Sequence, residues 1–452
     1  MALEMIFRGA TVVSPTGRRQ ADVGVENGKI VVVGDCSSLR AREEINAEAQ
    51  LLLPGLIDPH VHLRTPGGTH KEDFYTGTLA AASGGVTTVL DMPNTSPPTT
   101  TRARLAEKRA LVSGLSVVDF GLYLGATHDN HAELRAAEED ETPFVGIKIF
   151  MGASTGELLV SDPDALEAHF VHTRRLVAVH AEDEQILKVT AEVAREHHLT
   201  RTHAELRPPA AAVKAVATAV ELALKHACPL HICHVSTEVE LALLQAISPQ
   251  LVSCEASPHH LLLNETLEET LGHYVKVNPP LRAESDRLAL WEAVRSGRVE
   301  VLGTDHAPHL KAEKEQDYGR APSGIPHLDT SYRSMMWAVQ QGWLSLEKLV
   351  ALGSANPARI FGLMSKGQIA EGFDADLILV DAGEAQVLTE AGLYTRCGWS
   401  PFLGWKLPPK PAGVWVRGVQ VAAFGKVIRP EHRGREVQAQ ALPPRSDEAS
   451  QS

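Results

Sequence analysis

Six side chains that can bind a metal ion lie at the ends of apolar runs, or within them, far apart in the sequence. They are His60, His62, Lys148, His180, His234 and Asp305. Imidazole nitrogens and carboxylate oxygens are ligands that zinc-type divalent ions prefer. Taken singly, each histidine is more often a hydrogen-bonded core residue. If the fold brings all four to one cavity, each would need a separate hydrogen-bond partner there, so together they favour a metal site.

Lys148 lies in the middle of the apolar run VGIKIFMG, residues 145–152. A charged ammonium is costly to bury there without a partner. One interpretation is a buried salt bridge to Asp305 or Glu255. The other is that burial lowers the pKa of Lys148 and leaves a neutral amine that takes up carbon dioxide. The resulting carbamate is a carboxylate on a long stem, able to bridge two metal ions about 3.5–4 Å apart.

A second group of polar residues could bind the carboxylate of a substrate. His62 and Arg64 stand at alternate positions, so in a strand they would point to the same face. The guanidinium fork of Arg64 suits a carboxylate. Asn94, in DMPNTSPP, can donate and accept hydrogen bonds, and His309, in DHAPHL, adds a donor. The alternative for Asn94 is that it simply forms a turn.

Four further residues are expected near these groups, namely Ser154, Thr155, Cys233 and Glu255. The first two belong to the small-residue loop 152–157, which could be a lid over the substrate or an ordinary mobile loop. The other two stand at strand ends and could orient His180 or His234, or contact a further metal ion. We expect the orienting role for them.

Eight apolar, β-branched runs alternate with Ala- and Leu-rich stretches of helical character. The runs cover residues 51–61, 85–92, 117–126, 145–152, 176–182, 230–236, 251–257 and 299–307. The helical stretches include 72–84, 164–176, 208–227 and 285–297. Near-continuous apolar runs are typical of parallel strands buried on both faces. The alternation predicts an α/β fold, a (β/α)8 TIM-type barrel, whose strands all end on the face where active sites of this fold lie.

The two ends of the chain have the pattern of short strands. MIFRGATVV and ADVGVENGKIVVVG lie near the start, and FDADLILVD and AGVWVRGVQVAAFGKVI lie near the end. The Asn27-Gly28 pair is a strong signal for a two-residue hairpin. We expect both ends to pair in one small composite β-sheet domain. The predicted organisation is a small domain from 1–54 and 355–432, a barrel at 55–354 and a disordered tail at 433–452.

The composition excludes several other classes of protein. The net charge is −13, which makes nucleic acid and anionic membranes poor partners. The start of the sequence lacks the pattern of a signal peptide, and no apolar run is long enough to span a bilayer. The five cysteines are scattered and odd in number, as expected for reduced thiols in a cytoplasmic protein.

Several segments, in order along nearly the whole chain, resemble the cyclic amidohydrolase superfamily and, within it, the dihydroorotase family. They are PGLIDPHVHLRTPGGTHKEDF, GGVTTVLDMPNTSPPT, GIKIFMGASTG, VHAEDE, HICHVST, CEASPHHL, VNPPLR and GTDHAPH. The HxHxR element together with MPNT is the specific part. The resemblance implies two zinc ions, bridged by N6-carboxylated Lys148 and bound by His60, His62, His180, His234 and Asp305. It implies substrate binding by Arg64, Asn94, Asn278 and His309.

The resemblance also implies an activity and partners. The activity is the zinc-dependent, reversible interconversion of N-carbamoyl-L-aspartate and L-dihydroorotate in pyrimidine biosynthesis. Hydroxide formed at the two metals would attack the ring amide while Asp305 carries the proton. The partner is then a small molecule with a carboxylate. A homodimer and an association with aspartate transcarbamoylase are further expectations from the family.

Two alternatives stay open from the sequence. An allantoinase or hydantoinase shares the metal ligands, but hydantoins with apolar substituents offer no carboxylate to Arg64 and Asn94. The second alternative is an inactive dihydroorotase-like chain that serves as a scaffold for aspartate transcarbamoylase. Such a chain would be expected to have lost metal ligands, and this sequence keeps all of them.

Overall fold

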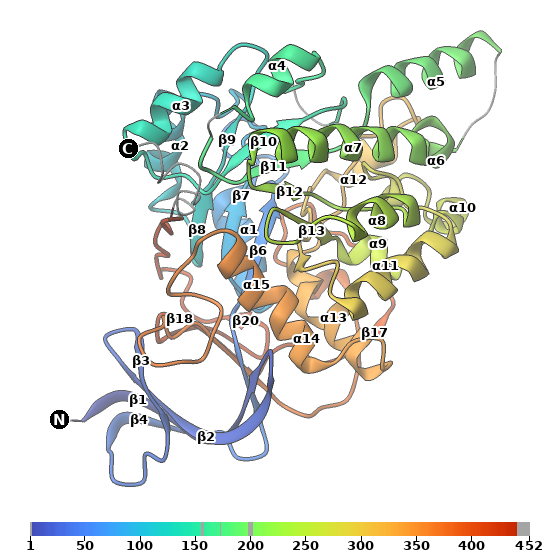
Figure 1. The fold of residues 1–452 in the computed structure, drawn as a ribbon. Coiled ribbons are helices and arrows are strands. Elements are labelled where there is room, and N and C mark those ends of the chain that lie inside the picture. Colours follow the sequence, from blue (N-terminus) through green and yellow to red (C-terminus); the bar gives the residue numbers. More distant parts are fainter. Residues whose placement is uncertain (1, 155–157, 172, 198–201, 441–452) are drawn as a thin grey trace.

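The computed structural model describes residues 2–154, 158–171, 173–197 and 202–440. Within these ranges, parallel strands form a barrel surrounded by helices, and a second sheet built from both chain ends lies beside it (Figure 1). The (β/α)8 barrel with a composite β-sheet, predicted from the sequence, is confirmed.

Two arcs of parallel strands make the barrel. Its strands are β6 (Leu56–Val61), β7 (Val86–Asp91), β8 (Asp119–Leu122), β9 (Leu124–Gly125), β10 (Ile147–Phe150), β11 (Val177–His180), β12 (Leu230–Ile232), β13 (Val252–Ala256) and β14 (Val301–Leu302). One arc is β6-β7-β8, and the other runs in order from β9 to β14. β8 and β9 correspond to one predicted run, which is interrupted at Tyr123. A parallel β-bridge between Val61 and His306 closes the barrel between its last and first strands.

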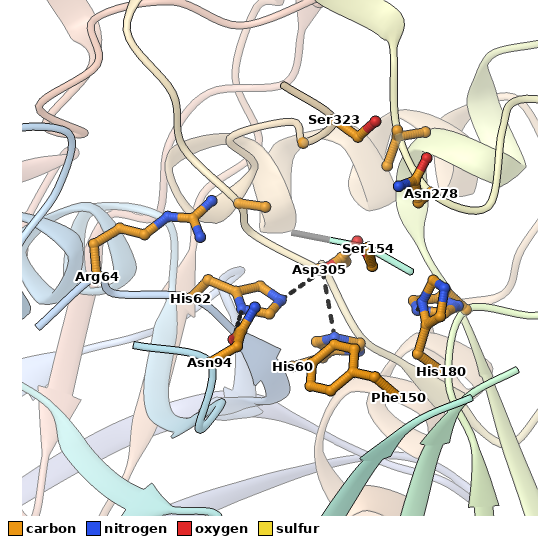
Figure 2. Close-up of a pocket in the computed structure, with 14 residues that line it drawn as sticks. His60, His62, Arg64, Asn94, Phe150, Ser154, His180, Asn278, Asp305 and Ser323 are labelled. Atoms are coloured by element: carbon orange, nitrogen blue, oxygen red, sulfur yellow. Dashed lines mark hydrogen bonds and ion pairs between the residues drawn. The ribbon is translucent and has the colours of Figure 1, made fainter. Parts of the chain in front are cut away.

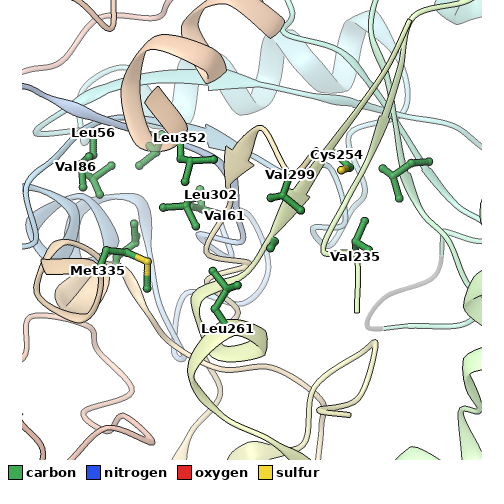
Figure 3. Packing of buried hydrophobic residues seen from close by; sticks show 14 of the residues in the cluster. Leu56, Val61, Val86, Val235, Cys254, Leu261, Val299, Leu302, Met335 and Leu352 are labelled. Carbon is green, nitrogen blue, oxygen red and sulfur yellow. The ribbon is translucent and has the colours of Figure 1, made fainter. Parts of the chain in front are cut away.

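The largest apolar cluster of the described residues fills the space around these strands. Figure 3 shows part of it, where Leu56 and Val61 from β6 lie near Val86 from β7 and Leu302 from β14. Val61 and Val86 are completely buried. Burial on both faces explains why these strands appear in the sequence as continuous apolar runs rather than alternating ones.

Helices follow most of the barrel strands. They are α1 (Phe74–Ser83), α2 (Arg102–Val112), α3 (His131–Glu139), α4 (Pro163–Ala168), α5 (Glu184–Glu196), α6 (His203–Leu206), α7 (Pro209–His226), α8 (Glu238–Gln245), α9 (Pro258–Leu262), α10 (Glu268–Leu271), α11 (Glu284–Ser296), α12 (Lys311–Lys314), α13 (Ser331–Gln340), α14 (Leu346–Val350) and α15 (Asn356–Ile360). In the part of the chain that the structure describes, no helix has the length and apolar character to cross a membrane.

One predicted helix is much shorter than expected. The stretch 164–176 is helical only to Ala168, where α4 ends. Beyond it, the His169 ring contacts the Thr127 carbonyl at 2.7 Å, and Phe170 is completely buried. These tertiary contacts replace the helix, because the chain must turn there to enter β11.

The composite sheet joins strands from both ends of the chain. They are β1 (Leu3–Ser14), β2 (Gly17–Glu26), β3 (Lys29–Gly34), β4 (Ala41–Asn46), β5 (Leu51–Pro54), β15 (Leu377–Val380), β18 (Gly413–Val416), β19 (Val419–Ala423) and β20 (Lys426–Val427). β15 lies antiparallel to β5 and connects the two sets of strands. Asn27 and Gly28, both at positive φ, form the predicted hairpin between β2 and β3. A separate short pair is β16 (Gln386–Val387) and β17 (Lys406–Leu407).

The run 51–61, expected to be one barrel strand, is two strands in different sheets. β5 ends at Pro54 in the composite sheet, and β6 begins at Leu56 in the barrel. Between them, a Cβ on Gly55 would lie 2.1 Å from Thr87 Oγ1, so only glycine fits at this crossing. Hydrophobicity alone did not reveal the division, because both strands are buried.

The segment 433–452, expected to be disordered, is ordered in its described part. Residues 433–440 run beside β8, where Val437 N donates to Phe120 O at 2.7 Å. The remaining residues, 441–452, lie outside the described ranges. Backbone hydrogen bonds to a barrel strand therefore order a segment whose composition suggested disorder.

A buried cluster of charges joins the barrel to the composite sheet. The Lys366 ammonium contacts Asp119 of β8, lies 2.6 Å from Asp376 Oδ2 just before β15, and lies 3.1 Å from Asp374 Oδ2. Arg417 also pairs with Asp119. Burial alone would lower the pKa of Lys366, but the neighbouring carboxylates raise it above its ordinary value.

Replacing Lys366 with methionine is expected to lower the free energy of unfolding by about 3–5 kcal/mol, because it leaves buried carboxylates without their cation. Urea unfolding followed by circular dichroism measures this change. Lys29 is the matched control, since it also pairs with Asp374, at 2.7 Å, but its side chain is 43% exposed. Lys29→Met should cost less than about 1 kcal/mol. Equal losses in the two variants would contradict the interpretation.

Candidate metal centre

The carboxyl ends of the barrel strands bring most of the predicted residues to one pocket (Figure 2). The pocket is lined by His60, His62, Arg64, Asn94, Phe150, Ser154, His180, His234, Val277, Asn278, Asp305, Ala307, Ser323 and Gly324. Four other predicted residues lie behind the pocket without lining it, namely Lys148, Cys233, Glu255 and His309. Glu255 contacts His60, His309 contacts Arg64, and Lys148 contacts Cys233 and lies 5.2 Å from the centroid of the Phe150 ring. The barrel topology thus brings together residues from along the whole chain, as expected from the positions of the strands.

The first group of candidate ligands lies between β6 and the end of β14. Asp305 Oδ1 lies 3.0 Å from His62 Nε2 and 3.3 Å from His60 Nε2 (Figure 2). One donor atom from each of these three residues falls within 4.8 Å of the other two, and all three are buried. This spacing is small enough for one cation to contact all three.

The second group lies at the carboxyl ends of β11 and β12. His180, the last residue of β11, directs Nδ1 toward His234 Nε2 at 3.1 Å. The ring centroids of His234 and His60 are 5.3 Å apart, so the two groups are adjacent. Two neighbouring sets of nitrogen and oxygen donors therefore face one space.

The outer nitrogen of three of these histidines contacts an acceptor. His62 Nδ1 lies 2.7 Å from Asn94 Oδ1, His180 Nε2 lies 3.0 Å from Glu182 Oε2, and His60 Nδ1 contacts Glu255. An oxygen acceptor requires the ring nitrogen to carry the proton. In the neutral ring, the opposite nitrogen then has a lone pair that faces inward. This arrangement is typical of histidines that bind metals, because the outer partner fixes the tautomer.

The electrostatics of the pocket differ between His60 and the other candidate histidines. Burial and Lys148 oppose a charge on His60, yet Glu255, Cys233 and Asp305 outweigh them and raise its pKa to about 10. Burial also opposes the charge on Asp305, but His60 and His62 hold the pKa of Asp305 below its ordinary value. Burial lowers the pKa of His62, His180 and His234, so these rings are neutral and, with the ionised Asp305, form a donor set that fits a divalent cation.

Lys148 is completely buried at the centre of β10. Its Nζ lies 3.0 Å from Cys233 Sγ and 5.2 Å from the centroid of the Phe150 ring. Among the described residues, no carboxylate lies within ion-pair distance of Lys148, so the salt bridge considered from the sequence is not formed. A buried amine beside a thiol and several imidazoles is therefore present next to the candidate ligands.

Glu255 contacts His234, as expected, but it and Cys233 also contact residues that were not expected. Glu255 accepts from His60 and from His231 Nε2 at 3.1 Å, and it also accepts the backbone N–H of His234 at 3.3 Å. Cys233 contacts Lys148. The partner of His180 is Glu182, which the sequence analysis did not single out. Glu255 and Cys233 therefore support mainly His60 and Lys148.

Arg64 borders the pocket, whereas His309 lies behind it. Arg64 Nη2 lies 3.1 Å from His309 Nε2, and Arg64 Nε donates to Pro308 O at 3.3 Å. His309 Nδ1 lies 3.2 Å from Lys71 Nζ, and burial together with Arg64 and Lys71 lowers the pKa of His309 well below its usual value. A neutral His309 ring has a single lone pair, so it can accept from only one of the two cations; with Nε2 as the acceptor it orients Arg64.

Asn278 lies on the opposite wall and is fixed from outside. His203 Nε2 contacts Asn278 Oδ1 at 2.9 Å, while His203 Nδ1 contacts the Tyr318 hydroxyl. Burial lowers the pKa of His203 to about 3, so the ring is neutral and donates to the amide oxygen. The amide N–H groups of Asn278 are then the part of the side chain available to a ligand.

The loop after β10 contributes one described residue to the pocket. Ser154 lines the pocket, and Thr155 lies outside the described residues. The sequence analysis missed Phe150, Val277, Ala307, Ser323 and Gly324, which also line the pocket. Phe150 could have been found two positions after Lys148, and Val277 and Ala307 beside Asn278 and Asp305 in the motifs VNPPLR and GTDHAPH, whereas Ser323 and Gly324 belong to a segment with no strand or motif pattern.

Three pocket residues adopt left-handed backbone conformations. The φ angles of Arg64, His234 and Asp305 are 55°, 34° and 47°. Such conformations cost about 1–3 kcal/mol each for residues other than glycine and are concentrated at functional sites. All three follow the end of a barrel strand, where the unusual turn directs the side chain into the pocket.

Comparison with known proteins identifies the class. The model of the amidohydrolase family matches residues 51–421. A dihydroorotase from Methanothermobacter thermautotrophicus is 37% identical over 424 residues, which cover 93% of this chain and 94% of that protein. A dihydroorotase from Halobacterium salinarum is 38% identical over 406 residues, 89% of this chain and 93% of that protein.

Solved structures of related enzymes have the same fold. An L-hydantoinase (dihydropyrimidinase) from Arthrobacter aurescens superimposes with a TM-score of 0.92 at 31% identity, covering 96% of this chain and all of that chain. A dihydropyrimidinase from Brevibacillus agri gives a TM-score of 0.89 at 29% identity, covering 97% of this chain and all of that chain.

The chain therefore belongs to the amidohydrolase family, whose members are metal-dependent hydrolases. Within that family its sequence groups with the dihydroorotases, as the resemblance of its motifs predicted.

Proposed function

We propose that this protein interconverts N-carbamoyl-L-aspartate and L-dihydroorotate. The observation that carries the proposal is Arg64, a guanidinium only 8% exposed that lines the same pocket as the candidate metal ligands. Among the described residues, Arg64 has no carboxylate within ion-pair distance. A buried cation of this kind needs an anionic partner, and the carboxylate of dihydroorotate would supply one.

Six residues would hold the metal ions, which we propose to be two zinc ions bridged by N6-carboxylated Lys148. His60, His62, His180, His234 and Asp305 would supply the other ligands. The neutral rings of His62, His180 and His234 and the ionised Asp305, all buried around one space, support this assignment. When bound, the metals would polarise the ring amide carbonyl and lower the pKa of a water molecule.

Asp305 is the residue that would move the proton in the reaction. It is ionised at neutral pH, because its pKa lies below the ordinary value, and its Oδ1 faces the centre of the pocket. In ring opening it would accept a proton from the attacking water and deliver it to the departing ring nitrogen. In ring closure it would remove a proton from the carbamoyl nitrogen.

The rest of the pocket would bind the substrate away from the reacting amide. Arg64, oriented by His309, would bind the carboxylate. Asn94 orients His62 with its amide oxygen, so a contact with the substrate would be made through its N–H groups. Asn278 and Ser154 would contact the remaining polar edge of the ring. We place the catalytic domain at 55–354 and the small domain at 1–54 and 355–432.

A second candidate activity is the hydrolysis of hydantoins or dihydropyrimidines, as the names of the structural relatives indicate for those proteins. It would use the same metal ligands and leave Arg64 without an anionic partner. An inactive scaffold is less well supported, because every candidate ligand is in place. A cytoplasmic location, a homodimer and an association with aspartate transcarbamoylase belong to the proposal through the family alone.

Replacing Arg64 with methionine is expected to lower kcat/KM for dihydroorotate about 100-fold, since removing one partner of a buried charge pair costs about 2–5 kcal/mol. Dihydrouracil has the same ring without the carboxylate, so its slower turnover should change less than about threefold. Initial rates for both substrates measure the two effects.

Arg175 provides the control for this experiment. It is also largely buried, but its Nη1 donates to Ala439 O, away from the pocket. Arg175→Met should leave the ratio of the two activities unchanged. An Arg64 variant that lost both activities equally would argue against a carboxylate contact.

A further inference from the structure

Two segments far apart in the sequence form the wall of the pocket that faces the β6 histidines. Val277 and Asn278 come from the chain before α11, and Ser323 and Gly324 come from the chain before α13. Figure 2 shows Asn278 and Ser323 next to one another, across the pocket from His60 and His62. Neither segment belongs to a barrel strand, so something other than the barrel must hold them together.

The side chain of Lys314, at the end of α12, connects these two segments. Its Nζ donates to Lys276 O at 3.0 Å, to Pro322 O at 2.9 Å and to Gly324 O at 3.0 Å. Lys314 is only 1% exposed, and its Nζ lies 5.7 Å from the centroid of the Trp399 ring. Among the described residues, no carboxylate lies within ion-pair distance of this ammonium. All three N–H groups therefore donate hydrogen bonds to backbone carbonyls of the wall.

Further hydrogen bonds and close backbone contacts pack the same region densely. Gly324 N donates to Lys276 O at 2.9 Å, so this carbonyl accepts from both the amide and Lys314. The Lys276 ammonium donates to Tyr318 O at 2.6 Å and to Ala321 O at 2.7 Å. At Gly324, where φ is +148°, a Cβ would lie 2.4 Å from Ala307 O. The wall thus depends on close backbone packing that a small displacement would disturb.

Removal of the Lys314 ammonium would take one donor from each of its three carbonyl partners, although Lys276 O would keep the Gly324 amide. A buried carbonyl without a donor is costly, and the backbone can avoid this cost only by shifting toward water. A shift of residues 322–324 would move Ser323 and Gly324 directly, and a shift of Lys276 O would move Val277 and Asn278. The metal ligands lie on barrel strands or within three residues of their ends and would stay in place.

We propose that Lys314 is a positioning residue, which holds the wall made by Val277–Asn278 and Ser323–Gly324 at the distance that the substrate ring requires. Lys314 touches neither the substrate nor the metal ligands. Its loss therefore weakens binding of the unreactive edge of the substrate ring, which raises KM rather than lowering kcat. The part of this inference that concerns turnover rests on the proposed function.

The test replaces Lys314 with methionine, which has a similar length and no donor. The expected result is a KM for dihydroorotate about tenfold higher, kcat within about threefold of the wild type, and an unchanged metal content. Hydrogen exchange followed by mass spectrometry should show faster exchange in residues 321–325, including the Gly324 amide. Lys314→Gln keeps two N–H groups and should give a smaller rise in KM; it replaces the methionine variant if that one does not fold.

Lys410→Met is the matched control. Lys410 is also largely buried and donates to Ser83 Oγ at 2.6 Å and to Gly392 O at 2.7 Å. Ser83 precedes the start of β7, so this lysine lies at the end of the barrel opposite the pocket. The control variant should lose a comparable amount of thermal stability without any change in KM.

Two results would overturn the inference. Unchanged exchange at 321–325 in Lys314→Met would mean that the lysine does not hold the wall. Faster exchange with an unchanged KM, or a loss confined to kcat, would mean that the wall does not set substrate binding. If the wild type does not turn over dihydroorotate, the proposed function fails, and the exchange measurement still decides whether Lys314 holds the wall.

Discussion

Replacing Asp305 with asparagine is expected to lower kcat for dihydroorotate ring opening by about 10⁴-fold, the upper range for removal of a general base. Asparagine keeps the shape of the side chain and an oxygen that can face His62. It cannot take up the proton of the attacking water, nor return one to the ring nitrogen. Stopped-flow or steady-state rates at saturating substrate measure the loss, and metal analysis shows whether the ions are retained.

The control for this variant is Asp162→Asn. Asp162 caps α4 by accepting the backbone N–H of Ala165 at 2.9 Å, and asparagine caps a helix equally well. Its activity should equal that of the wild type. An Asp305→Asn enzyme that retained its metals and more than a tenth of the wild-type kcat would exclude Asp305 as the residue that moves the proton.

The second large effect is expected for Lys148→Ala. If Lys148 carries the bridging carboxylate, its loss should reduce kcat about 10³-fold, equivalent to about 4 kcal/mol, together with a lower metal content. Small carboxylic acids such as acetate should restore part of the activity, because the shortened side chain leaves room for a carboxylate beside Cys233. The wild type should not respond to acetate.

A spectroscopic measurement tests the same assignment without mutation. Wild-type protein loaded with metal in ¹³C-bicarbonate should give a carbamate carbon signal that is absent from Lys148→Ala. Metal uptake should also slow when bicarbonate is removed. A fully active, fully metal-loaded protein with a free Lys148 amine would contradict the carboxylated lysine.

The barrel was predictable because its strands are buried on both faces and alternate with amphipathic helices. Three details were not, the first being the helix expected at 164–176, which ends at Ala168. The run 51–61 divides at Gly55 between two sheets, and hydrophobicity cannot separate strands that are equally buried. The segment 433–440 is ordered by backbone bonds to β8, and composition carries no information about such partners.

The site was predictable to the extent that its residues follow strands. His60, His62, His180, His234 and Asp305 converge because parallel strands end on one face of a barrel. Their outer partners were harder to find, since Asn94 was expected to bind substrate and in the structure contacts His62. Ser323, Gly324 and Lys314 depend on irregular segments whose path is set by tertiary hydrogen bonds, which no local pattern encodes.

The most direct test compares dihydroorotate with dihydrouracil on metal-loaded protein, with hydantoin and allantoin measured beside them. A carboxylate-binding metal centre predicts that kcat/KM for dihydroorotate exceeds that for dihydrouracil by about 10³-fold, and that a chelator abolishes both activities. Equal or faster turnover of dihydrouracil or hydantoin, or no turnover of any of the four with metal bound, would contradict the assignment.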